Sequence, residues 1–126
     1  MRQHTIIGQR IIGAAPELRS VGAIVRSSHE RFDGGGYPDG LAGEEIPLGA
    51  RIVAVCDAYD AMITDRAYRR GRPHHEAIEE LRRCAGGQFD PAVVAAFTDA
   101  MANDFALDEC AMARKASIER ALDVIN

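Results

Sequence analysis

Apolar residues recur at helical spacing along most of the chain. Between residues 4 and 14 the isoleucines stand at positions that share one face of a helix: Ile6, Ile7, Ile11 and Ile12. A second helix is predicted over about 17–31, with its apolar face formed by Leu18, Val21, Ile24 and Val25. No segment alternates between apolar and polar residues for long enough to indicate a strand. The pattern therefore predicts an all-α protein.

The third predicted helix, Arg51 to about Asp65, is the most apolar part of the chain. Its apolar residues cover nearly the whole circumference, which is typical of a buried helix. Further helices are expected at about 74–85, about 91–102 and about 108–124. Asp90 and Pro91 predict the start of the helix 91–102, because aspartate caps a helix and proline suits its first turn. Residues 1–126 are thus expected to form a single domain of about five to six helices.

A segment rich in glycine and proline, residues 33–48, separates the second helix from the third. An irregular connection of roughly fifteen residues is uncommon inside a compact domain and is usually functional. Its glycines allow backbone angles closed to other residues, and they let a ligand approach the main chain closely. Tyr37 is the aromatic residue of this glycine run, and His29 lies just before it. We therefore expect the loop to form an edge beside a potential metal ligand.

Composition narrows the class of protein. The net charge of −4 gives no indication of duplex nucleic acid as a partner. Cys56, Cys84 and Cys110 lack zinc-finger spacing, and the first two fall in apolar helices, so we expect buried, reduced thiols. No apolar run approaches the ~20 residues that span a membrane. These features predict a cytoplasmic protein without a membrane span.

Asp57 is the most informative single residue, because it lies in the middle of the apolar helix 51–65. A buried carboxylate costs several kcal/mol unless it is paired or bound to a metal. Two alternatives to metal ligation stay open: a salt bridge to an arginine, or a helix face that is less buried than its sequence indicates. Asp60, one turn further along, is a candidate to hold a ligand histidine through a hydrogen bond.

His4 and His29 are the other candidate ligands. Lone histidines near helix ends are more often capping or surface residues, so both interpretations stay open. Imidazole and carboxylate together suit Fe, Mn or Zn. His74-His75-Glu76 spells a similar motif, yet it stands at a helix start with no glycine loop after it, and we expect it at the surface.

Arg66 and Arg69 lie in a short basic connection after the apolar helix. Guanidinium groups suit phosphate because they donate two parallel hydrogen bonds, although a solvated basic turn is an equal alternative. Tyr37 is either a ring that stacks on a base or donates to phosphate, or a loop aromatic that packs back on the core. Glu30 is expected to support a ligand or to cap its helix rather than to bind metal.

Many of these residues belong to a series of motifs in a fixed order. The motifs are Ser28-His29-Glu30, Asp33-Gly34, Gly36-Tyr37-Pro38, Gly40-Leu41, Ile46-Pro47, Arg51-Ile52, the run from Cys56 to Met62, Asp65-Arg66, Tyr68-Arg69, His75-Glu76-Ala77 and Gln88-Phe89-Asp90-Pro91. Over about residues 1–97 the series resembles the HD-GYP family, which consists of bacterial metal-dependent phosphodiesterases that open cyclic di-GMP. The resemblance implies a helical HD-domain-like bundle with a long Gly-Tyr-Pro loop.

The resemblance also implies roles for individual residues. The residues that match metal ligands are His4, His29 and Asp57, with Glu30 and Asp60 in support. The residues that match positions in contact with the nucleotide are Tyr37, Arg66 and Arg69. The implied cofactor is a divalent metal, Fe or Mn or else Zn. In the family reaction, clustered metals generate a hydroxide and neutralise the phosphate, so that water attacks phosphorus in line.

The sequence departs from the family's pattern at two points. The family places a His-Asp dyad upstream of the position of His4, and Ser28 stands where it usually has the first of two adjacent histidines. We therefore expect the second half of an HD-GYP domain, truncated at its N-terminus and inactive on its own. A half-domain of this kind should expose an apolar face, and such faces favour homodimers or aggregation.

Two functions of different classes follow. The first is a metal-dependent phosphodiesterase domain acting on cyclic di-GMP in bacterial second-messenger signalling, located in the cytoplasm. The second is a non-catalytic module that senses the nucleotide or docks a signalling protein such as a diguanylate cyclase. The missing dyad and Ser28 favour the second for this polypeptide, whereas the Gly-Tyr-Pro loop and Asp57 favour the first for its family. A helical interaction protein without a ligand is a third option.

Overall fold

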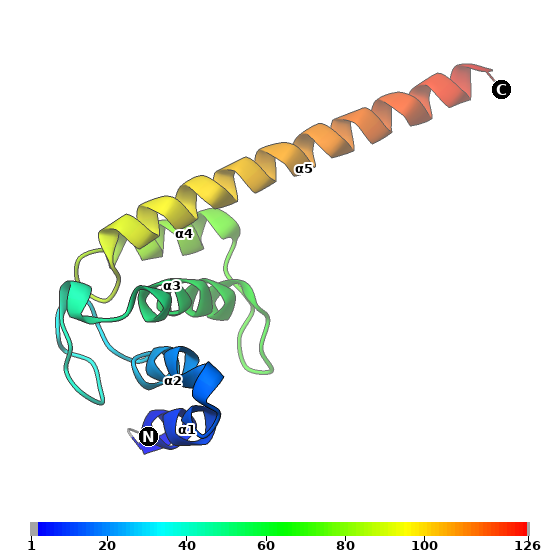
Figure 1. The fold of residues 1–126 in the computed structure, drawn as a ribbon. Coiled ribbons are helices and arrows are strands. Elements are labelled where there is room, and N and C mark those ends of the chain that lie inside the picture. The colour runs from blue at the N-terminus through cyan, green and yellow to red at the C-terminus, as the bar shows by residue number, and fades with distance from the viewer. Residues whose placement is uncertain (1–2, 126) are drawn as a thin grey trace. The chain divides into compact units, whose positions relative to one another are not determined.

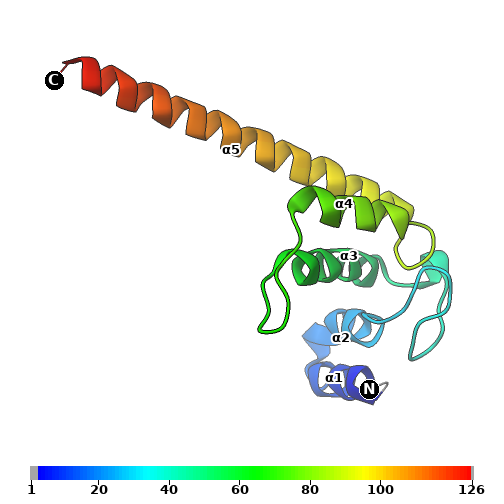
Figure 2. The same ribbon diagram turned by 180° about the vertical axis from the view of Figure 1, so that it is seen from behind.

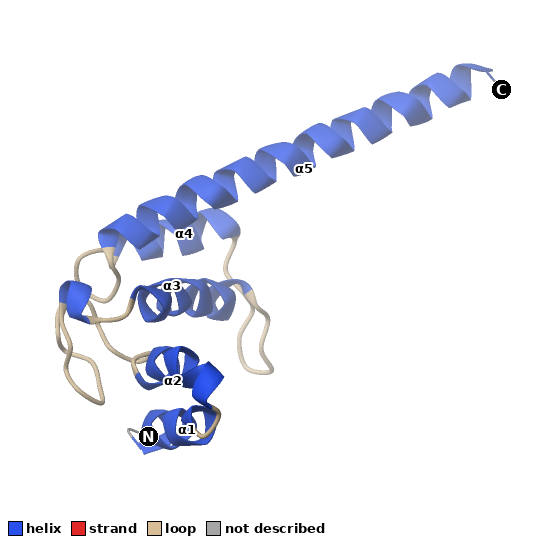
Figure 3. Ribbon diagram, in the orientation of Figure 1, coloured by secondary structure: helices blue, strands red, loops and turns tan. Residues whose placement is uncertain are grey.

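The computed structural model describes residues 3–125, and the side chains of residues 3–104 and 110–122. Over that range the regular structure is helical, without strands, which confirms the predicted fold class (Figure 3). The α-helices are α1 Gln3–Gly13, α2 Arg19–Arg26, α3 Leu48–Ile63, α4 His74–Arg83 and α5 Pro91–Ile125. Two 3-10 turns join them, η1 Pro16–Leu18 and η2 Gly43–Glu45.

The chain divides into two compact units, Met1–Ala95 and Ala96–Asn126. In the first unit α2 lies between α1 and α3, and α3 lies between α2 and α4, in both views of the ribbon (Figure 1, Figure 2). Its core is small, and the buried apolar residues come mainly from α3, α4 and the start of α5: Ile46, Ala50, Val55, Tyr59, Ala77, Ile78, Leu81, Phe89 and Val94. From α4, Ala77, Ile78 and Leu81 point into this core.

The prediction that the third helix is buried all round is wrong. In α3, Ile52 is 43% exposed and Val53 is 44% exposed, and the Cys56 thiol is exposed as well. The neighbouring helices cover the faces that carry Val55 and Tyr59 and leave this face open to solvent. Exposed apolar side chains do occur along the first unit, namely Ile7, Ile11, Leu18, Val21, Leu48, Ile52, Val53 and Ile63, whereas a single apolar face for a partner stays a prediction.

Asp90 ties the start of α5 to α3. Its Oδ1 accepts the Ala92 N–H at 2.8 Å, as the predicted helix cap requires, and its Oδ2 accepts Arg51 Nη1 at 2.7 Å. Burial opposes ionisation of this carboxyl, yet the hydrogen bonds from Arg51 and Ala92 outweigh burial and lower the pKa of Asp90. Asp90 is buried and Arg51 is half-buried, so the bond between them is partly shielded from solvent.

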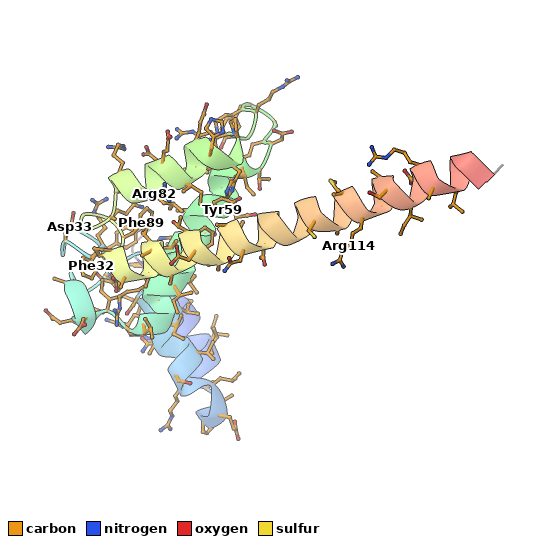
Figure 4. All side chains as sticks on the ribbon, turned by 90° about the horizontal axis from the view of Figure 1, so that it is seen from above. Phe32, Asp33, Tyr59, Arg82, Phe89 and Arg114 are labelled. Carbon is orange, nitrogen blue, oxygen red and sulfur yellow. The ribbon has the colours of Figure 1, made fainter. Side chains whose placement is uncertain are left out.

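The segment before α5 anchors the start of the Gly/Pro-rich loop. The Phe32 N–H donates to the Gln88 carbonyl at 3.1 Å, and the Asp33 N–H donates to the Gly87 carbonyl at 2.8 Å. Figure 4 shows Phe32, Asp33 and Phe89 gathered at one end of this unit. The two chain segments therefore hold each other through their backbones.

The second unit, residues 96–126, belongs to α5 as far as Ile125. Two helices were expected here, at 91–102 and 108–124, but α5 is continuous because no glycine or proline occurs between residues 92 and 125. Met112, Ile118 and Leu122 are exposed along it. Among the described residues, no helix is both long and apolar enough to cross a membrane.

Candidate functional site

The turn after α2 points two neighbouring side chains in opposite directions. The Glu30 N–H donates to the Ser27 carbonyl at 3.1 Å, and this closes a tight turn over residues 27–30. His29 is exposed on the outside of the turn, whereas Glu30 is buried beneath it. Ser28, the position where the resembled family carries a histidine, donates its hydroxyl to the Val25 carbonyl at 2.8 Å. The Ser28 hydroxyl therefore satisfies a backbone carbonyl in the last turn of α2.

Glu30 organises the Gly/Pro-rich loop. One carboxylate oxygen accepts the Asp39 N–H at 2.7 Å, and the other accepts the Leu41 N–H at 3.1 Å. A carboxylate is a strong acceptor for backbone N–H groups, so a single side chain fixes the far arm of the loop. The observed bonds hold the loop, whereas the expectation that Glu30 supports a ligand or caps its helix stays a prediction.

Gly36 brings Tyr37 onto His29. The Tyr37 N–H donates to the His29 carbonyl at 3.2 Å. A Cβ on Gly36 would lie 2.6 Å from both Glu30 Cα and the His29 carbonyl oxygen, and closer still to Arg31 N. Only glycine allows two backbone segments to approach in this way. The loop turns at Pro38, where the Tyr37–Pro38 peptide bond is cis.

Three aromatic rings from three elements form a row. The Tyr37 ring stacks on His29, with centroids 5.4 Å apart and an interplanar angle of 22°. The ring of His4, from the first turn of α1, meets His29 edge-on at 5.0 Å and 63°. The structure thus brings both predicted ligand histidines together, and it places the predicted substrate tyrosine beside them.

An open pocket of about 320 Å³ lies next to this row. His29, Tyr37 and Asp57 of α3 are among its lining residues. Asp57 is exposed, so the argument from burial in its favour is wrong. The pocket face of α3 otherwise carries short side chains that leave the carboxylate open, namely Ala54, Ala58 and Ala61. The remaining lining residues are Ser28, Glu30, Arg31 and Gln88.

The donor types at this pocket fit a divalent transition metal, because two imidazoles and a carboxylate are the ligands that such ions prefer. The positions of these side chains fit an ion less well than their chemical types do. Within residues 3–125, as far as their side chains are described, no three His, Cys, Asp or Glu side chains are grouped closely enough to hold an ion. His4 and His29 are adjacent, and His29 and Asp57 line the same pocket.

The predicted phosphate-binding arginines lie in the connection between α3 and α4. Arg66 and Arg69 exchange two backbone hydrogen bonds, at 2.7 and 3.1 Å. Arg69 Nη2 donates to the Ala61 carbonyl at 2.8 Å, and Ala61 lines the pocket. This connection and the loop of Tyr37 leave α3 at opposite ends in both ribbon views (Figure 1, Figure 2). Arg69 therefore stands at the end of the α3 wall away from the loop, and Arg66 is exposed beside it.

Two ion pairs fix charges along the Tyr37 loop. Hydrogen bonds from Arg26 lower the pKa of Asp39, and hydrogen bonds from Arg31 and the Gly35 N–H lower the pKa of Asp33. Both pairs are bidentate, with N···O distances of 2.8 Å for the two Arg26 bonds and of 3.1 and 2.9 Å for the Arg31 bonds. The charges of these four residues are therefore paired along the loop.

The contact between His74 and Tyr59 was not predicted from the sequence, and the predicted role of Asp60 stays untested. His74 was expected at the surface, but it is half-buried, and its Nδ1 lies 2.8 Å from the Tyr59 hydroxyl on α3. No sequence signal indicated this contact, because the two residues belong to different helices. Burial raises the pKa of Tyr59. Asp60 is exposed, and its carboxylate accepts the Thr64 hydroxyl at 3.4 Å.

Cysteine burial was also predicted wrongly. Cys56 and Cys110 are exposed, and Cys84 is half-buried beside Glu80 on α4. All three are free thiols. Cys56 is exposed because the α3 face that carries it is open to solvent.

Known proteins with similar sequences share this region. A cyclic di-GMP phosphodiesterase of Thermotoga maritima is 44% identical over 99 residues, covering 77% of this chain and 27% of the relative. A probable cyclic di-GMP phosphodiesterase of Vibrio cholerae is 40% identical over 105 residues, with 77% and 24% covered. The chain therefore spans about a quarter of the length of these relatives.

A solved structure of a cyclic GMP-AMP specific phosphodiesterase of V. cholerae also matches. It has a TM-score of 0.59 and 27% identity, and the match covers 68% of this chain and 19% of that one. HD-domain phosphodiesterases are metal-dependent, which agrees with the donor types around the pocket. The sequence profile described as HD domain matches residues 1–93, nearly all of the first unit. The chain therefore belongs to the HD domain family.

Proposed function

We propose that residues 1–95 form part of the active site of a metal-dependent phosphodiesterase that opens a cyclic dinucleotide, in the first place cyclic di-GMP. The observation that carries the proposal is the meeting of His29, Tyr37 and Asp57 at one pocket, with His4 against His29. The names of the relatives support a cyclic dinucleotide as the substrate. Relatives specific for cyclic GMP-AMP leave the identity of the second base open.

His4, His29 and Asp57 are the residues that would hold a divalent ion, with Fe or Mn favoured over Zn. Such an ion supplies a hydroxide near neutral pH and neutralises phosphate charge. Tyr37 offers an aromatic face to a base or a hydroxyl to phosphate beside that position. Arg66 and Arg69 neutralise phosphate charge from the far end of α3. Asp60 stays a candidate to orient a ligand histidine, because the Thr64 hydroxyl donates to only one of its two carboxylate oxygens.

These residues supply only part of the machinery for hydrolysis. Stabilising both the attacking and the leaving oxygen takes two metal ions, and three candidate ligands are too few for two ions. The Ser28 hydroxyl is also engaged with the Val25 carbonyl. We therefore expect the 126-residue polypeptide to bind metal and nucleotide, and to hydrolyse only where further ligands are supplied.

A non-catalytic role is the second candidate function. The observation in its favour is that no three metal-ligating side chains are grouped closely in the described part of the chain. A module of this kind would sense the nucleotide, or it would dock a signalling protein such as a diguanylate cyclase or a second copy of itself. The exposed apolar side chains of α1, α2 and α3 offer surface for such a partner. Three free thiols, two of them exposed, favour the bacterial cytoplasm as the location.

The test is a calorimetric titration of the polypeptide with cyclic di-GMP, with and without Mn²⁺ or Fe²⁺, together with an assay for the linear product. We expect metal-dependent binding that Asp57→Asn and Tyr37→Ala weaken. His75→Ala is the matched control, because this exposed histidine lies on α4 and does not line the pocket. Failure of the wild type to bind nucleotide with any metal would overturn the proposal. Product formed by the polypeptide alone would exclude the non-catalytic role.

A further inference from the structure

Arg26, the last residue of α2, joins three parts of the site without lining the pocket. Its Nε and Nη2 each donate to the Asp39 carboxylate at 2.8 Å. Its Nη1 donates to Gln9 Oε1 on α1 at 3.0 Å. One rigid guanidinium therefore spans from the first helix to the Tyr37 loop, a geometry that the fixed fork of an arginine suits better than a lysine.

The two segments that Arg26 joins are those that carry the rings flanking His29. Gln9 lies on α1 with His4, and Asp39 lies two residues beyond Tyr37. His29 itself follows Arg26 by three residues, across the turn that ends α2. Arg26 is therefore bonded both to the helix that carries His4 and to the loop that carries Tyr37.

The ion pair between Arg26 and Asp39 is expected to affect the geometry of the site more than the stability of the fold. The side chains of Arg26 and Asp39 are 31% and 36% exposed, and solvent screens ion pairs this exposed, so they add little to stability. Glu30 already holds the loop to the end of α2 through two backbone N–H groups. What Arg26 adds is the connection to α1, which Glu30 does not make.

We propose that Arg26 is a positioning residue of this site: it holds the helix of His4 and the loop of Tyr37 in register on either side of His29. The arrangement of the rings follows from contacts already described. Its consequence for nucleotide binding rests on the proposed function. Loss of Arg26 should let the two segments move independently and reduce the preorganisation of the pocket.

The direct test measures the proximity of the three rings by NMR. In the wild-type chain we expect nuclear Overhauser contacts between the ring protons of His29 and those of both His4 and Tyr37. Arg26→Ala should weaken both contacts, and Arg26→Lys should restore them only in part. Arg83→Ala is the control, since Arg83 makes a comparable exposed bidentate pair with Glu80 on α4, away from the pocket. Unchanged contacts in Arg26→Ala would overturn the proposal.

Two single-branch variants separate positioning from a general loss of structure. Gln9→Ala removes only the link to α1, so it should weaken the His4–His29 contact and spare the Tyr37–His29 contact. Asp39→Asn weakens only the link to the loop and should do the reverse. Equal loss of both contacts in both variants would indicate a purely structural role and refute the proposal.

Nucleotide binding gives an independent reading. Arg26→Ala should weaken cyclic di-GMP binding about tenfold, a loss of about 1.4 kcal/mol, while the unfolding midpoint stays close to that of Arg83→Ala. If Arg26→Ala loses the ring contacts but the wild type binds no nucleotide, the positioning role is supported and the proposed function is refuted. Wild-type affinity in a variant that has lost the ring contacts would refute the predicted consequence for binding.

Discussion

Replacing Gly36 with alanine tests the packing of the loop on which the site depends. The new Cβ would lie 2.6 Å from Glu30 Cα and from the His29 carbonyl oxygen, and closer still to Arg31 N. All three atoms belong to the backbone, so no side chain can rotate away and the loop must move. Overpacking of this kind costs typically about 1–3 kcal/mol. The Tyr37–His29 backbone hydrogen bond, worth about 1 kcal/mol, would be lost with it.

We therefore expect Gly36→Ala to lower the free energy of unfolding by about 2 kcal/mol or more, or roughly 10 °C in the melting temperature of a unit of this size. Urea unfolding followed by circular dichroism measures it. Gly13→Ala is the matched control, because a Cβ there meets nothing within 4 Å and alanine favours the end of α1. A Gly36→Ala protein as stable as Gly13→Ala, with the Tyr37–His29 ring contact intact, would refute the reasoning.

Two further changes follow from the same structure. The pKa of Asp90 is lowered in the folded state, so its pair with Arg51 contributes stability above the unfolded pKa of ~3.9 and loses it as the pH falls through the folded value. Asp90→Asn should thus cost about 1.5–3 kcal/mol at pH 7 and show a smaller loss on acidification, measured by urea unfolding at several pH values. An equally steep acid loss in the variant would count against this. Gly71→Ala would place a Cβ 2.5 Å from the Ile63 carbonyl carbon, displacing the connection that carries Arg69. Cyclic di-GMP binding should weaken about tenfold by calorimetry, and unchanged affinity would exclude a role for this connection.

The sequence predicted the helices and the chemistry better than it predicted burial. The helical spacing of apolar residues located α1, α3 and α4, and the Asp90-Pro91 pair located the start of α5. Apolar content alone could not tell which face of α3 would be covered, because coverage depends on which helices pack against it. For that reason Asp57 and Cys56 were expected inside and are exposed.

Contacts between distant segments were beyond the reach of the sequence pattern. Nothing in the spacing of Arg26, Gln9 and Asp39 indicates that they meet, since they belong to two helices and a loop. The contact of His74 with Tyr59 was missed for the same reason. The continuity of α5 could have been predicted from the absence of glycine and proline between residues 92 and 125.

The roles of His4, His29 and Asp57 as metal ligands stay predictions, and metal binding tests them most directly. The measurement is a titration with Mn²⁺ followed by electron paramagnetic resonance, in which bound ion is counted against free ion. We predict that the wild type and His75→Ala bind Mn²⁺ alike, and that His29→Ala and Asp57→Asn bind it about tenfold more weakly or worse. No binding by the wild type, or the same affinity in all four proteins, would contradict the assignment of the metal site to this pocket.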